Sequence, residues 1–179
     1  MRVAPEELPI PMAWQQDDSI AAFEHLMHQH ERLVLRTALR MLGRLEDAQD
    51  VAQEVFMKLY RHIGNIDAAR GVESWLYRTT MNACFDQLRR RRPVEPIEWE
   101  PPIAAVQHTD MERDQRRQLV SEALKTLPEK ERAAVILREI EGLETAEVAQ
   151  ILGSSEATVR SQVSMGRTRL KRCLEGVRA

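Results

Sequence analysis

The chain has 179 residues, enough for one medium-sized domain or two small ones. Hydrophobic residues make up 43% of it and aromatic residues only 4%, and no run alternates in the way a strand does, so we expect an all-α protein. The sequence contains no apolar stretch of about 18 residues or more and no signal-peptide pattern at its start, which argues against a membrane-spanning or secreted protein and favours a cytoplasmic one.

The formal net charge of −2 conceals a strong segregation of charge. Residues 89–92 are four consecutive arginines, and 157–172 is also basic. Residues 93–114, in contrast, hold six acidic side chains against a single arginine. The sequence therefore predicts two basic surfaces, each suited to an anionic partner, on either side of an acidic connector.

Proline positions divide the chain, because proline interrupts a helix. We expect an N-terminal tail at 1–18, a helical domain at 19–92, an extended acidic linker at 93–114 and a second helical domain at 115–179. Pro128 suits the first turn of a new helix. The other seven prolines fall in the tail and the linker: Pro5, Pro9, Pro11, Pro93, Pro96, Pro101 and Pro102.

The clearest amphipathic stretch is 43–63. Asp47, Asp50 and Glu54 share one side of this predicted helix. Considered alone, these carboxylates are either a solvated acidic face or a binding surface, and the residue types do not decide between them. The opposite side is apolar at helical spacing: Ala48, Val51, Ala52, Val55, Phe56 and Leu59.

A loop at 64–72 leads to a predicted helix at 73–92. On this helix Trp75, Asn82, Asp86 and Arg89 fall near one face. Such a surface offers an aromatic ring for stacking, an amide for base edges and a cation for the backbone, as single-stranded nucleic acid requires. A buried tryptophan with solvated neighbours is the alternative interpretation.

Residues 145–172 are typical of a helix, a short turn and a second, basic helix. Ala149 is small where the two helices would touch, Gly153 stands where the first must end in a left-handed conformation, and Val159 would anchor the second helix in the core. The second helix has an inward stripe of Val159, Val163, Gly166 and Leu170 and a polar flank of Arg160, Ser164, Arg167 and Lys171. This layout predicts a helix-turn-helix that contacts DNA, although any small helical domain can contain a glycine-broken helix pair.

No part of the sequence predicts catalysis or a cofactor. His25, His28 and His30 could meet a metal ion only on a distorted helix, so we expect a solvated or partly packed histidine face and no metal site. Neither a nucleophile–base motif nor a phosphate-binding loop is present. Cys84 and Cys173 lie far apart, and we expect no disulfide between them.

Together, three ordered segments resemble a compact bacterial sigma factor of the extracytoplasmic-function (ECF) group of the sigma-70 family. Residues 47–63 are similar to region 2.2, and 127–163 are similar to region 4. Residues 74–92 are similar to regions 2.3 and 2.4, with Trp75, Leu76, Asn82, Asp86 and Arg89 in register. The resemblance extends from about 20 to 172 and implies two small helical domains in a promoter-specificity subunit of RNA polymerase.

The resemblance also implies which residues meet each partner. Core RNA polymerase would bind at Asp47, Asp50, Gln53 and Glu54. The minus-ten promoter element would be opened and held by Asn65, Ile66, Asp67, Trp75, Arg78, Asn82, Asp86 and Arg89. The minus-35 element would meet Thr158, Arg160, Ser161, Gln162, Ser164 and Met165, with Arg167 and Lys171 placed for phosphates. An anti-sigma factor would be a further partner.

The sequence departs from the family pattern at three positions. Gln162 and Met165 stand where family members usually carry a basic residue, which should weaken DNA binding and make its salt dependence shallower. Glu144 stands where a serine often caps the first helix of the motif, and Thr145 could supply the cap one position later.

The main alternative function is a stand-alone helix-turn-helix transcriptional regulator. Such a protein usually needs an effector or receiver domain and a dimer interface, and the first helical block has neither a receiver-like strand pattern nor a heptad seam.

Overall fold

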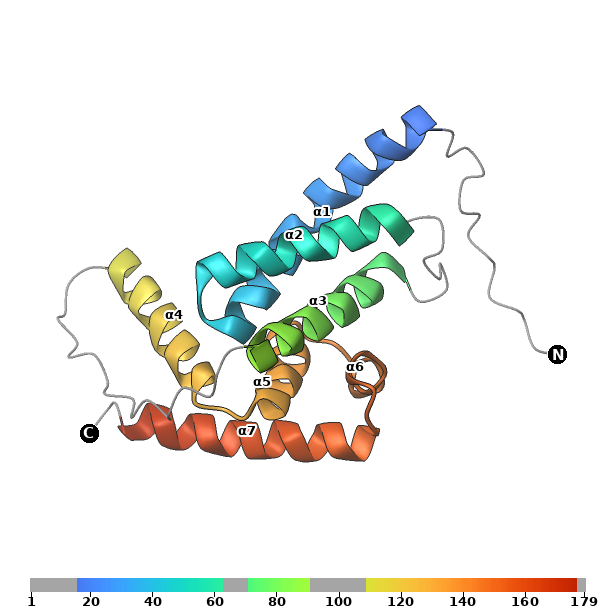
Figure 1. Cartoon of the computed structure of the whole chain (residues 1–179). Helices are drawn as coiled ribbons and strands as arrows, with labels where there is room; N and C mark the ends of the chain where they lie inside the picture. The colour runs from blue at the N-terminus through green and yellow to red at the C-terminus, as the bar shows by residue number, and fades with distance from the viewer. Residues whose placement is uncertain (1–15, 63–70, 91–108, 177–179) are drawn as a thin grey trace.

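The computed structural model describes residues 16–62, 71–90 and 109–176. Within these ranges the secondary structure is entirely helical, which confirms the predicted all-α class. Figure 1 shows the elements in chain order: α1 (Gln16–Leu42), α2 (Leu45–His62), α3 (Gly71–Arg90), α4 (Thr109–Lys125), α5 (Glu129–Val135), η2 (Ile136–Ile140), α6 (Thr145–Leu152) and α7 (Glu156–Gly176).

Helices α1 to α3 form the N-terminal unit. Gly43 has a φ of +72°, and its N–H donates to the carbonyl of Leu39 at 2.8 Å, which ends α1 and lets α2 fold back along it. The predicted apolar stripe of α2 is confirmed, with Ala52 and Phe56 half-buried at its margin. Its central residues Ala48, Val51, Val55 and Leu59 are buried against Val34, Ala38 and Met41 of α1 and Leu76, Met81 and Cys84 of α3.

The C-terminal unit contains the predicted helix-turn-helix, formed by α6 and α7. Gly153 adopts the left-handed conformation (φ 61°, ψ 40°) expected at the end of α6. Ala149 and Val159 are buried where the two helices meet. The steric requirements inferred from the sequence are therefore confirmed by the backbone.

Two local predictions are corrected in this unit. The cap of α6 is Glu144, not Thr145: Glu144 is extended, and its N–H donates to Oε2 of Glu147 at 3.1 Å, so Thr145 is already helical. The predicted linker at 93–114 is helical at its end, because α4 begins at Thr109.

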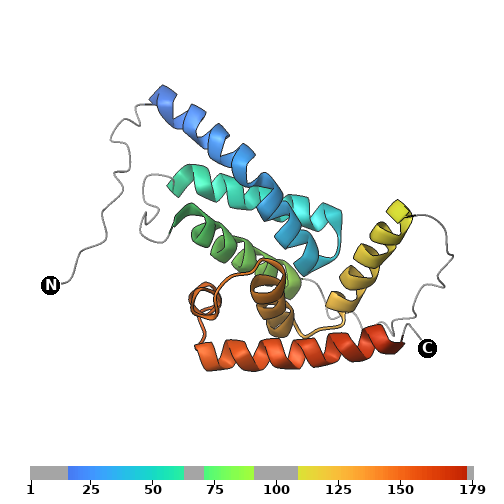
Figure 2. The ribbon, with the colours of Figure 1, turned by 180° about the vertical axis from the view of Figure 1, so that it is seen from behind.

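The two units pack against each other. Helix α6 lies against α3, while α4, α5 and η2 meet α1, and Figures 1 and 2 show this arrangement from opposite sides. Residues 91–108, which include most of the predicted linker, lie outside the described ranges. None of the described helices is long and apolar enough to cross a membrane.

Candidate nucleic-acid interface

Helix α7 has one buried side and one open side. Val159, Val163 and Gly166 are buried, and Leu170 is half-buried beside them, as the sequence predicts. Helical geometry turns most of the predicted minus-35 residues to the opposite side, where they are exposed: Thr158, Arg160, Ser161, Ser164, Met165, Arg167 and Lys171.

Gln162 is the exception in this predicted set. Its side chain is half-buried, and its Oε1 atom is inaccessible to solvent. Met165, in contrast, is 44% exposed on the open side of the helix. Gln162 and Met165 are the two positions that lack the expected basic residue. Only Met165 is therefore exposed on the candidate DNA-binding surface.

The start of α7 is fixed by Ser155, which the sequence analysis did not single out. The Thr158 N–H donates to Ser155 Oγ at 3.1 Å, and the Val159 N–H donates to the Ser155 carbonyl at 3.0 Å. A serine four residues before the buried Val159 is a recognisable N-cap signal. The cap also engages the Thr158 hydroxyl, whose Oγ1 lies 2.8 Å from Ser155 Oγ.

Basic side chains of α7 border a groove of about 760 Å³ between α4, η2 and the helix itself. Arg160, Arg167 and Lys171 are among its lining residues, and Arg160 is also paired with Glu156 at 2.6 Å. Two further exposed residues, Thr168 and Arg172, follow the same open side and were not in the predicted set. Their helical spacing, four residues after Ser164 and seven after Met165, was the available signal. The positive charge of this helix is therefore distributed along its length.

Arg169 has a different role. Its Nε lies 3.1 Å from Oε2 of Glu131, a carboxylate on α5 that is only 9% exposed. This pair holds α7 on α5, directly beside Gly166. Arg169 therefore positions the open side of α7 and is less available to phosphates than Arg172.

Helix α3 presents the second polar face. Arg78, Asn82 and Arg89 are exposed along one side, and Asp86 is ion-paired with Arg89. Trp75 begins the same side but is half-buried and packs against the core, so only part of its ring is open for stacking. The predicted residues Asn65, Ile66 and Asp67 lie outside the described residues.

Helix α2 carries the predicted acidic face, and its members are not equivalent. Asp50 and Gln53 are exposed, and Glu54 is 43% exposed and paired with Lys58 at 2.6 Å. Asp47 is only 15% exposed and accepts a hydrogen bond from Nε2 of Gln87 at 3.3 Å. Asp47 therefore ties α2 to α3, while the other members of the set face solvent.

Two large side chains extend this face and were not predicted. Met57 is 50% exposed, and Tyr60 is 51% exposed with its ring against Phe23, at a centroid distance of 5.2 Å. Met57 follows Asp50, Gln53 and Glu54 at helical spacing, which was the available signal. A surface that combines carboxylates with exposed apolar side chains is typical of a protein-binding face.

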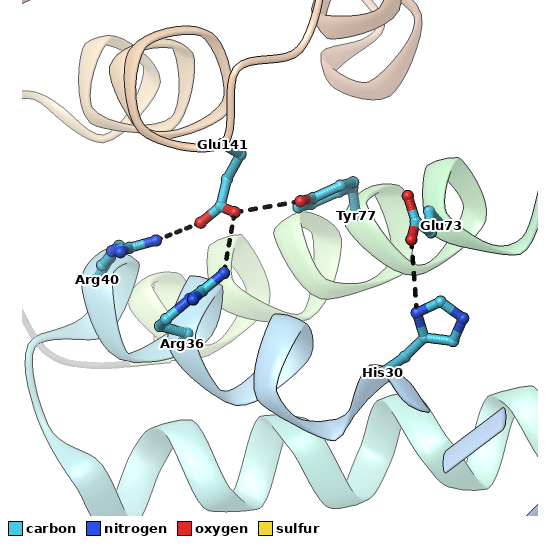
Figure 3. A network of polar contacts seen from close by, with 6 residues as sticks. All are labelled: His30, Arg36, Arg40, Glu73, Tyr77 and Glu141. Carbon is cyan, nitrogen blue, oxygen red and sulfur yellow. Dashed lines mark hydrogen bonds and ion pairs between the residues drawn. The ribbon is translucent and has the colours of Figure 1, made fainter. Parts of the chain in front are cut away.

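Among the described residues, the histidines and cysteines do not assemble a further site. His25 and His28 are exposed, whereas His30 is buried with its Nδ1 3.9 Å from Oε1 of Glu73 (Figure 3). In the part of the chain that the structure describes, no group of three or more potential ligands is arranged to hold a metal ion. Cys84 and Cys173 are both free, and burial raises the pKa of the Cys84 thiol to about 12, which keeps it neutral.

The fold and these faces define a class of protein. A helix-turn-helix with a basic open side is combined with a second polar helix face and an acidic protein-binding face, all on helical units. This combination defines a DNA-binding protein that also meets a protein partner.

Family models match both units of the chain. Residues 26–94 match Sigma-70 region 2, and residues 117–170 match Sigma-70 region 4. The chain belongs to the sigma-70 family, in its ECF group, and is a promoter-recognising sigma subunit of RNA polymerase. It is a DNA-recognition subunit and not an enzyme, and the matches do not favour a stand-alone regulator.

Full-length relatives support this assignment. The chain is 35% identical over 160 residues to the ECF RNA polymerase sigma factor SigM of Mycobacterium tuberculosis, covering 86% of this chain and 77% of the relative. It is 31% identical over 167 residues to the RNA polymerase sigma-H factor of Pseudomonas aeruginosa, covering 86% of each protein.

Solved structures share the fold. CnrH, in complex with the cytosolic domain of CnrY, is 25% identical with a TM-score of 0.65, over 88% of this chain and 90% of that one. The sigma factor RpoE from Bartonella quintana, in complex with the anti-sigma factor NepR, is 23% identical with a TM-score of 0.69, over 86% of this chain and 97% of that one.

Proposed function

We propose that the open side of α7 docks in the major groove of the minus-35 element and that the polar face of α3 receives the opened minus-ten element. The observation that carries this proposal is the sharp division of α7, with Val159 and Val163 buried on one side and exposed polar and basic side chains on the other. A helix divided in this way can enter a groove without losing its own packing.

For the minus-ten element, Asn82, Arg78 and Arg89 are the exposed groups on α3. An amide can hydrogen-bond a base edge, and arginines follow the phosphate backbone. Extruding a base costs a few kcal/mol, and stacking with hydrogen bonds returns about 1–3 kcal/mol per base. The chain would therefore open DNA by binding the separated strand, with Asn65, Ile66 and Asp67 contributing to base capture.

For core polymerase, the proposed contact surface is the exposed face of α2, formed by Asp50, Gln53, Glu54 and Met57. Asp47 would support this surface from behind through its hydrogen bond to Gln87. Carboxylates around an exposed apolar side chain fit a basic protein surface that itself has an apolar centre.

The proposed function also implies where the protein acts and what regulates it. A protein that binds promoter DNA together with core polymerase acts in the cytoplasm. The solved relatives were captured with protein partners, one of them named an anti-sigma factor, which supports a partner of that kind for this chain. Such a partner would act by covering the polymerase-binding and DNA-binding faces.

The test is charge reversal on the α2 face. We expect Asp50→Lys with Glu54→Lys to lose binding to core polymerase by at least about tenfold, because attraction turns into repulsion across the interface. The control is Glu129→Lys with Glu175→Lys, an equal change of charge at exposed positions of the C-terminal unit. Equal core affinity of the α2 variant and the unmodified chain would contradict the assignment of this face.

A further inference from the structure

The first turn of α7 carries a carboxylate on a helix that is otherwise basic. Glu156 is the first residue of α7, and its side chain is 48% exposed. Its Oε2 accepts a hydrogen bond from Nη2 of Arg160 at 2.6 Å, one helical turn later, and the Arg160 side chain is 63% exposed. Both charged groups of this pair are therefore open to an incoming ligand.

The backbone fixes the turn that presents the pair. Ser155 caps the helix directly before Glu156, and its Oγ accepts from the Thr158 N–H at 3.1 Å. Val159, which precedes Arg160, is fully buried and anchors the same turn in the core. The position of Glu156 and Arg160 is therefore set by a capped and packed turn.

A carboxylate at this end of α7 is poorly suited to contact with phosphates. Duplex DNA carries one negative charge for about every 1.7 Å of its axis, so the backbone repels it. The other carboxylate of α7, Glu175, lies at the far end of the helix, 3.7 Å from Lys171. Glu156 lies at the end that contacts base edges in a helix-turn-helix. A base, and not the backbone, is therefore the partner that this position favours.

The pair retains hydrogen-bonding groups of both kinds for such a partner. Glu156 meets Arg160 through Oε2, so Oε1 can accept from a base. Arg160 donates from Nη2, which leaves Nε and Nη1 as donors. In the major groove, a glutamate accepts from the amino group of cytosine, and an arginine donates to O6 and N7 of guanine. The pair therefore matches one cytosine and one guanine.

The geometry of the pair fits two neighbouring base pairs. Residues four apart in an α-helix differ by about 6 Å along the axis, at about 1.5 Å per residue. The step between base pairs is about 3.4 Å. The side chains of Glu156 and Arg160 start from different heights and converge to 2.6 Å, so their remaining atoms can reach adjacent steps.

We propose that Glu156 is a specificity-determining residue of α7, whose carboxylate accepts a hydrogen bond from the amino group of a cytosine in the minus-35 element, next to a guanine bound by Arg160. This inference deepens the proposed function and rests on the docking of α7 in that element. Thymine and guanine present acceptor oxygens in place of the amino group, and these repel a carboxylate. The contact therefore selects against them.

A purely structural role for Glu156 predicts a different result. A carboxylate in the first turn stabilises a helix through its dipole, whatever the helix binds. Glu129 occupies the same place in α5, as the first residue of that helix, and it is also exposed. Replacing either residue by alanine removes one carboxylate from a helix N-terminus. Glu129→Ala is therefore the matched control for Glu156→Ala.

The test measures the base preferences of core polymerase assembled with the full-length chain. The assembled polymerase binds a promoter library in which the minus-35 element is randomised and the minus-ten element is held at one sequence. Sequencing of the bound DNA gives the preference at each base pair. The unmodified chain, Glu156→Ala and Glu129→Ala are compared at one salt concentration, because phosphate contacts depend on salt.

We expect the unmodified chain and Glu129→Ala to prefer cytosine at one base pair by about tenfold, the typical effect of one base contact. Glu156→Ala should lose this preference and keep the preference for the adjacent guanine. Unchanged preferences in Glu156→Ala, or a loss confined to the guanine, would overturn the inference.

If Glu156→Ala does not fold, Glu156→Gln decides in the same way, because it keeps the side-chain length and its amide should admit adenine at the cytosine position. Here too, an unchanged cytosine preference would overturn the inference. An unmodified chain without any base preference upstream would contradict the docking of α7 itself. An upstream preference that does not depend on Glu156 would contradict this inference alone.

Discussion

Arg132 of α5 donates a hydrogen bond from Nη1 to the backbone carbonyl of Met41, 2.7 Å away in the last turn of α1. The same guanidinium donates from Nη2 to the carbonyls of Lys125 at 2.7 Å and Leu127 at 2.9 Å. One buried side chain thus satisfies the end of α1 and the turn between α4 and α5 at the same time. It is a polar connection between the two units.

Replacing Arg132 by lysine should destabilise the chain by about 2–4 kcal/mol, because a single ammonium cannot reach all these carbonyls and the remaining ones are left buried. Urea denaturation followed by circular dichroism measures the change. Arg138→Lys is the control, since Arg138 is only partly buried and its nearest acidic partner, Glu144, is 4.0 Å away. Equal midpoints for the two variants would show that the Arg132 hydrogen bonds contribute little.

Gly166 lies where α7 packs closely against α5. A Cβ atom at this position would lie 2.6 Å from Cγ2 of Val135. We expect Gly166→Ala to destabilise the chain by about 1–2 kcal/mol despite the better helix propensity of alanine. In a Val135→Ala background the same change should stabilise it by up to about 1 kcal/mol. Thermal unfolding of the four chains forms a double-mutant cycle, and additive effects would rule out the contact.

Met165 offers a direct test of how the recognition helix faces DNA. We expect Met165→Arg to tighten binding of the assembled polymerase to its promoter and to steepen the slope of log K against log salt by about 0.9, the effect of one more phosphate contact. Gln162→Arg should change the slope less, because Gln162 is half-buried. Filter binding at several salt concentrations distinguishes these results, and the reverse order would mean that another side of α7 meets the groove.

Cys84 should make stability fall at high pH. Its pKa is raised from 9.0 to about 12 by burial, so the folded state holds the thiol proton more tightly than the unfolded state. The resulting contribution of the thiol to the free energy of unfolding is fully present below about pH 9. It is lost as the pH rises toward about 12, at up to about 1.4 kcal/mol per pH unit.

Cys84→Ala should remove this part of the alkaline loss, at the cost of about 1 kcal/mol at neutral pH for the missing buried atom. The measurement is urea denaturation of both chains at several pH values between about 8 and 11. The two chains carry the same other titrating groups, so the difference between them isolates the thiol. Parallel curves for the two chains would show that the thiol does not ionise on unfolding in this range.

The sequence was sufficient to predict the helices and the helix-turn-helix, because these depend on local patterns. The apolar stripe of α2, the left-handed Gly153 and the buried Val159 all follow from residue types at helical spacing. Contacts between helices that are distant in sequence could not be predicted in this way. Asp47 is drawn toward Gln87, and Glu141 is directed toward α1 and α3 by a π-turn that no propensity distinguishes from an α-turn (Figure 3).

The same limit applies to the candidate DNA surfaces. The family motif correctly grouped Arg160, Ser161 and Ser164 on an exposed side, yet Gln162 is turned partly inward. Trp75 is half-buried for a similar reason, because a large ring near the core gains more by packing than by exposure. At the margin of a buried stripe, the neighbouring helix decides which residues face outward. That neighbouring helix is distant in sequence.

We propose that this one chain directs core polymerase to two promoter elements. The most direct measurement is selection from a randomised promoter library by core polymerase with and without the chain, followed by footprinting of the selected DNA. We predict enrichment of two separated motifs only when the chain is present, and loss of the upstream footprint alone in Arg160→Ala. Enrichment of a single motif, or equal selection by the chain without core polymerase, would contradict this account.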